Sequence, residues 1–429
     1  MSEEDPFEAY RRFFALEPDV LVLSVAMFAF SLGFQMTFRY LAEYLTVLGA
    51  SAAIVGLYKS FSDLVGAVYP YAGGVVSDVV GSRRALTAFG LFSVVGFGIW
   101  AVAPELQGLA VGPVDVPAWA WVFVGFVLAQ AWKSFGLGAT FAVVKQSVDP
   151  DRLATGFAST EVFRRVGFLV GPVLAAVVLA VVTPFAVGFQ YVILVAAGFG
   201  IVATLVQHFL YDASQDTFGS SFAGLDSVRA DLRSLPDPLR PLLVGDAFVR
   251  FGNGMVYALF VLVVADLRTV GFTGFGITLA PEPYFGILLS VEMVVALLVM
   301  WPAAKLARRV GLVPVVASGF LVYAVFPVVL IVAPADQWVY AAIFAASGLR
   351  FAGLPAHKAL IVGPAERDTG GRVTGSYYLV RNTLIIPAGV LGGWLYGRDP
   401  VLAFSLASVI AGVGVLYFVV YGEEFAAYA

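Results

Sequence analysis

Ionisable side chains occur inside long apolar runs of this 429-residue chain, where no bulk water would surround them. A charge near the centre of a bilayer costs about 2.5–3.5 kcal/mol on insertion scales, so it usually faces a partner, a cavity or a transported ligand. These positions are therefore the first candidates for chemistry. The nine cations are Arg39, Lys59, Lys133, Arg164, Arg165, Arg250, Arg350, Lys358 and Arg381, and the five acids are Glu43, Asp63, Glu161, Asp246 and Glu292.

Four pairs of opposite charge are spaced i,i+4, which places both members on one face of a helix. Pairing lowers the cost of burying a charge, so a static structural ion pair is one interpretation of each. It is the preferred interpretation for the pair nearest the predicted outer end of a span, and Lys358 is expected to extend toward the inner surface. The pairs are Arg39/Glu43, Lys59/Asp63, Glu161/Arg165 and Asp246/Arg250.

The same carboxyl groups are candidates for coupling to a proton, because burial raises a carboxyl pKa and a nearby cation lowers it. A movement that separates acid from cation would then load or release a proton. Asp246 with Arg250 and Asn253 is one preferred set, and Glu161 with Arg164 and Arg165 is the other. Sodium remains an alternative coupling ion. The full set of coupling candidates is Asp63, Glu161, Asp246, Glu292, Arg164, Arg165 and Arg250.

Three cations near mid-span, Lys133, Arg350 and Arg381, have no acid three or four residues away. Subtracting five acids from nine cations leaves an intramembrane charge of +4, which is costly unless an anion compensates it. We therefore expect an anionic solute that carries a carboxylate or phosphate. The alternative is neutralisation by an acid on another helix, such as Asp63 or Glu292. The predicted substrate-binding residues are Lys133, Arg350, Arg381, Gln35, Gln130, Asn253 and Asn382.

The composition excludes several other functions. Hydrophobic residues make up 60% of the chain and charged residues 13%, whereas soluble proteins have about 25% charged residues. There are no cysteines and two histidines, so no disulfide, thiolate metal site or cofactor is expected. A net charge of −4 without a basic tail argues against nucleic-acid binding. No phosphate-binding loop or hydrolase motif is present, so the chain is not expected to be an enzyme.

About 20 apolar residues are needed to cross a bilayer, and the sequence contains twelve such runs. Each is expected to be a helix, because hydrocarbon offers backbone groups no other partner. The predicted organisation is a lead-in at 1–19, six spans in 20–210, a linker with an amphipathic helix at 211–240, six spans in 241–421, and a tail at 422–429. The spans are 20–44, 52–77, 85–103, 119–144, 154–182, 185–210, 241–265, 284–307, 312–333, 338–362, 373–396 and 401–421.

Basic residues fix the orientation. Fourteen fall in the segments placed inside and two, Arg268 and Arg398, in the segments placed outside. Because inner loops of membrane proteins carry the excess of Lys and Arg, both termini are predicted to be cytoplasmic. The protein is expected in the cytoplasmic membrane.

The motif Gly74, Asp78 and Gly81, followed by Arg83 and Arg84, lies at the end of the second run and just before the third. This pattern resembles the gating loop between helices two and three of the major facilitator superfamily, with Ser82 in place of the usual cation. The two halves also look like repeats: Lys133–Gly138 matches Arg350–Pro355, and Thr155-Gly156 matches Thr374-Gly375. The second copy of the loop motif, at Ala304, Arg308 and Gly311, is degraded.

The resemblance implies an all-α membrane protein of twelve helices in two pseudo-symmetric six-helix bundles. It also implies transport by alternating access and a functional monomer. Spans one, four, seven and ten would line a central cavity. Lys133 and Arg350 would then face a shared site from opposite halves.

A further stretch, Gly167, Gly171 and Pro172, resembles a Gly-Pro signature of the family's antiporters. Its alternative is simple helix packing with a proline kink. The sequence thus predicts a secondary transporter of a small anionic solute, coupled to protons. The main alternative is a multidrug or amphipathic-solute/proton antiporter, which this stretch and the 37 phenylalanines favour. A transport-inactive sensor and a membrane enzyme are lesser alternatives.

Overall fold

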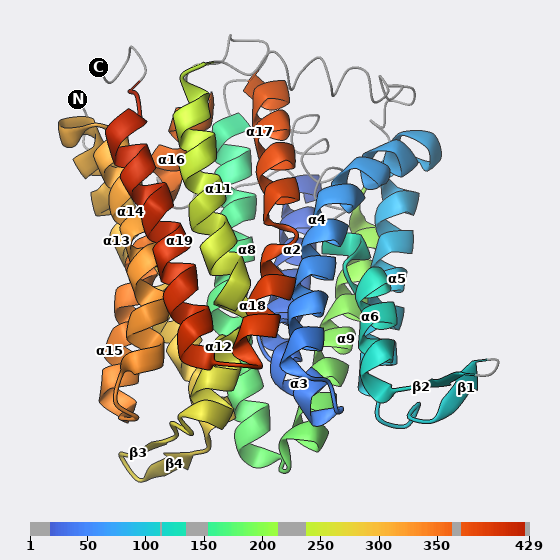
Figure 1. The fold of residues 1–429 in the computed structure, drawn as a ribbon. Helices are drawn as coiled ribbons and strands as arrows, with labels where there is room; N and C mark the ends of the chain where they lie inside the picture. The colour runs from blue at the N-terminus through green and yellow to red at the C-terminus, as the bar shows by residue number, and fades with distance from the viewer. Residues whose placement is uncertain (1–17, 112–113, 134–152, 213–236, 363–369, 425–429) are drawn as a thin grey trace. The chain divides into compact units, whose positions relative to one another are not determined.

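The computed structural model describes residues 18–111, 114–133, 153–212, 237–362 and 370–424 (Figure 1). The chain folds as two compact units, one comprising Met1–Phe38 and Val68–Phe222, the other Arg39–Ala67 and Ala223–Ala429. The predicted amphipathic helix of the linker lies outside the described residues, as do most of the lead-in and tail. The two units do not coincide with the predicted halves 20–210 and 241–421, because residues 39–67 belong to the second unit. The division into these halves therefore stays a prediction.

The first unit is built from α2 packed against α8 and α9, with α5 packed against α6 and α9. The Phe30 ring stacks on the Trp132 ring at 4.2 Å, and the buried Trp100 indole donates to the Val122 carbonyl at 2.8 Å. Aromatic packing thus fills its interior. Its elements are α2 (Pro18–Thr37), α5 (Ser82–Ala101), β1 (Leu109–Val111), β2 (Val114–Val116), α6 (Ala118–Ala129), α8 (Leu153–Val181) and α9 (Phe185–Leu210).

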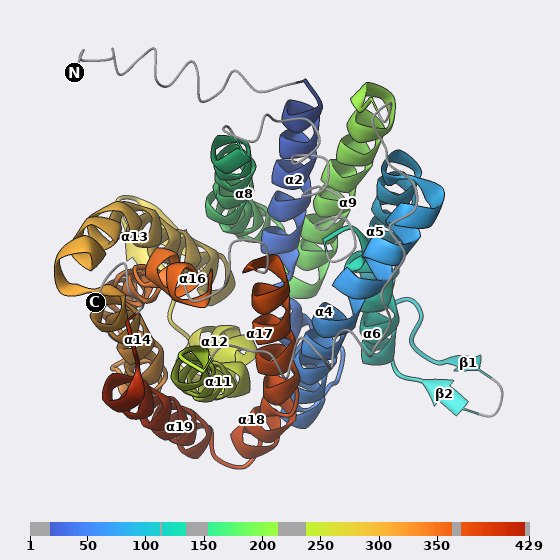
Figure 2. The ribbon, with the colours of Figure 1, turned by 90° about the horizontal axis from the view of Figure 1, so that it is seen from above.

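The second unit contains more helices and strands than the first. Helix α4 (Ala52–Val80) contributes its first sixteen residues to the second unit. Helix α11 packs against α14, α16, α17, α18 and α19, which Figure 2 shows around it. The other elements are α3 (Leu41–Val47), α11 (Leu239–Val256), η1 (Tyr257–Leu259), α12 (Phe260–Leu262), η2 (Val263–Leu267), β3 (Phe272–Gly274), β4 (Ile277–Leu279), α13 (Pro281–Val310), α14 (Leu312–Val332), α15 (Gln337–Ser347), η3 (Gly348–Phe351), α16 (Leu354–Val362), α17 (Gly370–Ile385), α18 (Ala388–Tyr396) and α19 (Pro400–Tyr421).

Each of the twelve predicted spans coincides, over its described residues, with one helix or with consecutive helices. Eight described helices are long and apolar enough to cross a membrane, or nine if the bent pair of α2 and α3 is one span. The predicted fold class is confirmed by the fold comparison given below, whereas the count of twelve spans stays a prediction. Two antiparallel hairpins, β1–β2 and β3–β4, were not predicted; each has strands of three residues.

Gly81 and Gly311 end α4 and α13 in the same way. Their φ angles are +88° and +93°, a region that residues with a Cβ rarely adopt. Each residue also begins the next helix, α5 or α14. The two glycines that the repeat pattern paired therefore adopt the same turn conformation.

One predicted ion pair does not form. The chain leaves the helix at Phe38–Tyr40, and α2 and α3 meet at a bend of 42°. Arg39 and Glu43 are therefore not one turn apart on a continuous helix, and no ion pair between them is found among the described residues. The Arg39 guanidinium instead lies 4.1 Å from the centroid of the Tyr257 ring.

Candidate functional site

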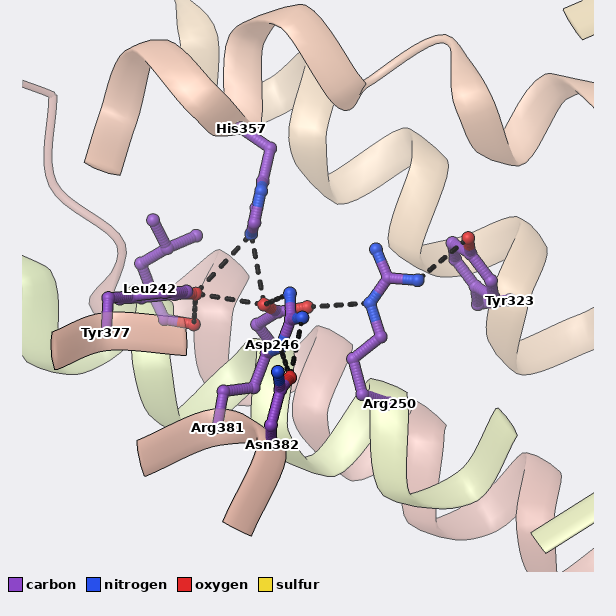
Figure 3. A network of polar contacts seen from close by, with 8 residues as sticks. All are labelled: Leu242, Asp246, Arg250, Tyr323, His357, Tyr377, Arg381 and Asn382. Carbon is purple, nitrogen blue, oxygen red and sulfur yellow. Dashed lines mark hydrogen bonds and ion pairs between the residues drawn. The ribbon is translucent and has the colours of Figure 1, made fainter. Parts of the chain in front are cut away.

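A fully buried carboxylate, Asp246 of α11, is the centre of a polar network in the second unit (Figure 3). One turn later on the same helix, the Arg250 Nε lies 3.2 Å from the Asp246 Oδ1. The predicted i,i+4 pair is therefore present. Arg250 also donates from Nη1 to the Tyr323 hydroxyl of α14 at 2.9 Å, so the network extends from α11 to α14.

The second oxygen of Asp246 is contacted from two other helices. His357 Nε2 of α16 lies 3.1 Å from Oδ2, and the Tyr377 hydroxyl of α17 donates to Oδ2 at 3.0 Å. Arg381, one turn beyond Tyr377, reaches Oδ2 with Nη1 at 3.3 Å. Figure 3 shows these side chains converging on the carboxylate. A single buried acid thus joins α11, α16 and α17.

Arg381 and Asn382 were both predicted to bind substrate, and the structure brings them together. Arg381 Nη2 donates to the Asn382 Oδ1 at 2.8 Å. Arg381 had no acid nearby in sequence, but it finds Asp246 across the packed helices. Asn253 lies on α11 seven residues after Asp246 and is partly buried.

A second buried ion pair lies on neighbouring elements of the same unit. Arg350 of η3 and Glu292 of α13 are 3% and 4% exposed, and Arg350 Nη2 lies 2.6 Å from Glu292 Oε1. Ser347 donates to the other Glu292 oxygen at 2.6 Å. Arg350 was interpreted either as a substrate contact or as a cation neutralised by an acid on another helix. The structure shows that it has such an acid partner, Glu292. Substrate contact by Arg350 stays a prediction.

The two networks meet at one tyrosine. The Tyr323 ring centroid lies 4.7 Å from the Arg250 guanidinium carbon and 5.3 Å from that of Arg350. A cation over a tyrosine ring is attracted by the ring's negative face. A small cavity of about 10 Å³ borders both arginines, Tyr323 and His357.

The predicted substrate-binding residues of the first unit are Lys133, Gln130 and Gln35. Lys133 is exposed, with its Nζ 5.3 Å from the Phe34 ring centroid and 5.2 Å from that of Phe38. Gln130 is buried, and its Nε2 has no hydrogen-bond partner among the described residues. Gln35 lies on α2 where α8 packs against it.

The remaining predicted coupling residues lie on α4 and α8. The Lys59 ammonium bonds to the Asp63 carboxylate, as the spacing predicts. Arg164 lies 5.2 Å from the Phe168 ring centroid. The side chain of Glu161 is outside the described part of the chain, so its pairing with Arg165 stays a prediction. Lys358 is exposed, and its extension toward the inner surface stays a prediction.

The predicted gating and packing motifs are partly described. Arg83 donates from Nε to the His208 carbonyl at 2.7 Å, and Arg84 is exposed. The side chain of Asp78, four residues after Gly74, is not among those described. In α8, a Cβ at Gly171 would lie 2.8 Å from the Gln35 Cβ, and one at Gly167 would lie 2.9 Å from the Ser31 Cβ. These glycines therefore allow α8 to pack closely against α2. Pro172 follows inside α8.

The sequence analysis missed four members of the networks: His357, Tyr377, Tyr323 and Ser347. A signal existed for two of them. His357 follows Arg350 by seven residues, about two helical turns, and Tyr377 precedes Arg381 by four, so each lies near the face of a residue already identified. No group of three or more His, Cys, Asp or Glu side chains that could bind a metal is found in the described residues.

Comparisons with known proteins agree with the fold. No family model matches the chain. It is 20% identical over 403 residues to an uncharacterized MFS-type transporter of Methanocaldococcus jannaschii, covering 92% of this chain and 93% of that one. A putative uncharacterized MFS-type transporter of Mycobacterium tuberculosis is 31% identical over 189 residues, which are 43% of this chain and 40% of the relative. The chain is therefore similar over nearly its whole length to a transporter of the major facilitator superfamily type.

Solved structures show the same fold at low sequence identity. A peptide transporter POT in complex with sulfate has a TM-score of 0.72 at 14% identity, covering 95% of this chain and 94% of that one. A POT family transporter in complex with 5-aminolevulinic acid has 0.72 at 12%, covering 96% and 99%. The nucleoside transporter NupG has 0.66 at 12%, covering 95% and 100%. These relatives and neighbours are transporters, not enzymes, which supports transport as the function of this chain.

Proposed function

We propose that this protein is a secondary active transporter of a small anionic solute, coupled to protons and working by alternating access. The observation that carries the proposal is the Asp246 network. One buried carboxylate is held at once by Arg250, His357, Tyr377 and Arg381. A static ion pair would need one cation, whereas this acid has two arginines and a histidine.

The charge of the two networks favours an anion. Three arginines, Arg250, Arg350 and Arg381, face two carboxylates, Asp246 and Glu292. Three minus two leaves a charge of +1 with His357 neutral. An uncompensated buried cation is expensive, and an arginine presents donors in the planar geometry that a carboxylate or phosphate matches. A solute of negative charge would complete this balance.

Asp246 is the proposed coupling residue. A proton on this carboxylate would remove the charge that attracts Arg250 and Arg381 and would weaken the links from α11 to α16 and α17. A proton on His357 would add a third cation at the same acid, and histidine is the side chain whose ordinary pKa lies nearest neutrality. Proton binding at this network would thereby change how three helices pack.

Alternating access is supported by a close helix contact at one end of the second unit. A Cβ at Gly389 of α18 would lie 2.6 Å from the Gly56 carbonyl oxygen of α4, and one at Gly393 would lie 2.6 Å from the Gly56 Cα. The Val390 N–H donates to the Ser60 hydroxyl oxygen at 3.0 Å. This smooth, glycine-lined contact presents few obstacles to separation, and we propose that it opens and closes during transport.

A lateral groove favours the second candidate, an amphipathic-solute/proton antiporter. It has a volume of about 700 Å³ and is lined almost wholly by apolar atoms of α4 and α18 and of the turn before α18, including Leu57, Phe61, Pro387 and Trp394. A solute with a large apolar part would fit such a surface better than a small anion would. The close approach of α8 to α2 through Gly167 and Gly171 is compatible with either candidate.

The test uses purified protein in sealed vesicles that contain a pH-sensitive dye. We would add small mono- and dicarboxylates and phosphate esters in one series, and lipophilic cations such as tetraphenylphosphonium in the other. The anion proposal expects saturable proton movement with the first series, abolished by a protonophore. Movement with the lipophilic cations alone would establish the second candidate and refute the first. We also propose that the protein works as a monomer in the cytoplasmic membrane with both termini inside.

A further inference from the structure

A small cavity lies inside the second unit between α14, η3 and α16. Its polar lining consists of Arg250, Tyr323, Arg350 and His357, and its volume is about 10 Å³. Room for one water molecule begins at about 10–15 Å³ in this measure. Gly319 and Gly353 also border it and let α14 approach η3 closely. The cavity is thus at the lower limit for one water-sized atom.

Arg350, which borders this cavity, has hydrogen-bond donors to spare. Its Nη2 atom is used by Glu292, but Nε and Nη1 are buried and have no hydrogen-bond partner among the residues that the structure describes. The side chain as a whole is 3% exposed. Buried polar groups are nearly always hydrogen-bonded, and unpaired charged donors are the costliest exceptions. A ligand that accepts from these two nitrogens would remove the cost.

The charge of the cavity lining indicates the sign of that ligand. Arg250 and Arg350 both lie against the Tyr323 ring, and the networks around them carry +1 with His357 neutral, as counted above. A water molecule could accept hydrogen bonds from these donors but would leave this charge. One monovalent anion would satisfy the donors and neutralise the excess.

We propose that this cavity is an anion-binding site, occupied by one small anionic group held on the Nε–Nη1 edge of Arg350, with Arg250 and His357 beside it. The group is either a free halide such as chloride or the carboxylate of the transported solute. Only the second source rests on the proposed function. A bulky anion that has no carboxylate group to insert into the cavity does not fit.

The experiment measures thermal unfolding of the detergent-purified full chain by tryptophan fluorescence. Sodium chloride, sodium bromide or sodium acetate replaces sodium 2-(N-morpholino)ethanesulfonate, a bulky anion without a carboxylate, at constant ionic strength. The site predicts saturable stabilisation by at least one of the three small anions relative to the morpholinoethanesulfonate reference. Arg350→Gln should weaken the apparent affinity at least tenfold, and Arg398→Gln, whose side chain is exposed on Trp394, should leave it unchanged.

Arg350→Gln leaves Glu292 without its partner and could fail to fold, so the double variant Arg350→Gln/Glu292→Gln provides the second measurement. It keeps the pair neutral and should fold but lose the anion response. An unchanged response in this double variant would overturn the site, as would stabilisation of the wild type that does not exceed the morpholinoethanesulfonate control.

Transport distinguishes the two sources. If chloride raises the half-saturation concentration for carboxylate uptake without lowering the maximal rate, the solute's carboxylate uses the site. If chloride stabilises the protein and leaves uptake unchanged, the site takes a free anion. Should no carboxylate be transported while halide stabilisation persists in the wild type and is lost in the double variant, the proposed function fails and the site stands.

Discussion

The Nη1 atom of Arg381 on α17 lies 3.3 Å from the Oδ2 atom of Asp246 on α11, although 135 residues separate the two. This is the longest of the four contacts that Asp246 makes with charged or phenolic groups. It is also the contact that joins the middle of α17 to α11. Through this contact the charges gathered at Asp246 bear on how α11 packs against α17.

Asp246→Ala is expected to destabilise the protein strongly. The substitution leaves Arg250 and Arg381 buried without their acid, and removing one partner of a buried ion pair costs about 3–5 kcal/mol. Thermal unfolding in detergent should show a clear fall in midpoint. Asp399→Ala, which removes an exposed helix cap of α19, should cost about 1 kcal/mol. Equal shifts in the two variants would contradict the assignment of Asp246 as the centre of the network.

His357→Gln is expected to flatten the pH dependence of transport between pH 5 and 8. Histidine is the side chain that ordinarily titrates in this range, and His357 lies 3.1 Å from Asp246 with Arg250 and Arg381 at the same carboxylate. The chain has two histidines, so His208→Gln is a matched control that should keep the wild-type profile. A profile altered only by His208→Gln would place the titrating group in the first unit.

Gly311→Ala should lower stability by at least about 1–2 kcal/mol, the cost of forcing a Cβ into the left-handed region. The φ angle is +93°, and the added Cβ would lie 2.5 Å from the Glu424 Oε1. That oxygen accepts from the Val313 N–H at the start of α14 at 2.7 Å. Gly412→Ala is the control, because its Cβ would meet no atom within 4 Å. A Gly311→Ala protein as stable as Gly412→Ala would refute the proposed turn.

The contact between α4 and α18 offers a test of alternating access. The chain has no cysteine, so Ser60→Cys and Val390→Cys can be joined specifically by a short bifunctional thiol reagent. Cross-linking should reduce uptake at least tenfold, and each single variant treated in the same way should keep its rate. Full uptake by the cross-linked protein would show that this contact does not need to open.

The sequence located much of the site through local spacing. Asp246 and Arg250 are one helical turn apart, and α11 is continuous there, so their pairing followed from the sequence. The same rule was wrong for Arg39 and Glu43, because the helix breaks between α2 and α3. The rule contains no information about where a helix ends.

Contacts between helices could not be derived in the same way. Arg381 meets Asp246, and Arg350 meets Glu292, through packing of elements far apart in the chain. Glu292 was named as a possible acid partner, but spacing could not choose it over Asp63. His357 was noted only as one of too few histidines for a metal site, although it follows Arg350 by two turns. The sequence predicts which residues share a helix face, but only the packed structure shows which residue of another helix each of them contacts.

The most direct test of the central claim compares two modes of transport by Asp246→Asn in sealed vesicles. The substrate is a radiolabelled carboxylate that the wild type takes up, and Asp63→Asn is the control, because Asp63 belongs to the separate Lys59 pair. We predict that Asp246→Asn exchanges internal for external carboxylate but no longer accumulates it when an inward proton gradient is applied, whereas Asp63→Asn does both. Accumulation by Asp246→Asn at the wild-type level would contradict the assignment of proton coupling to this network.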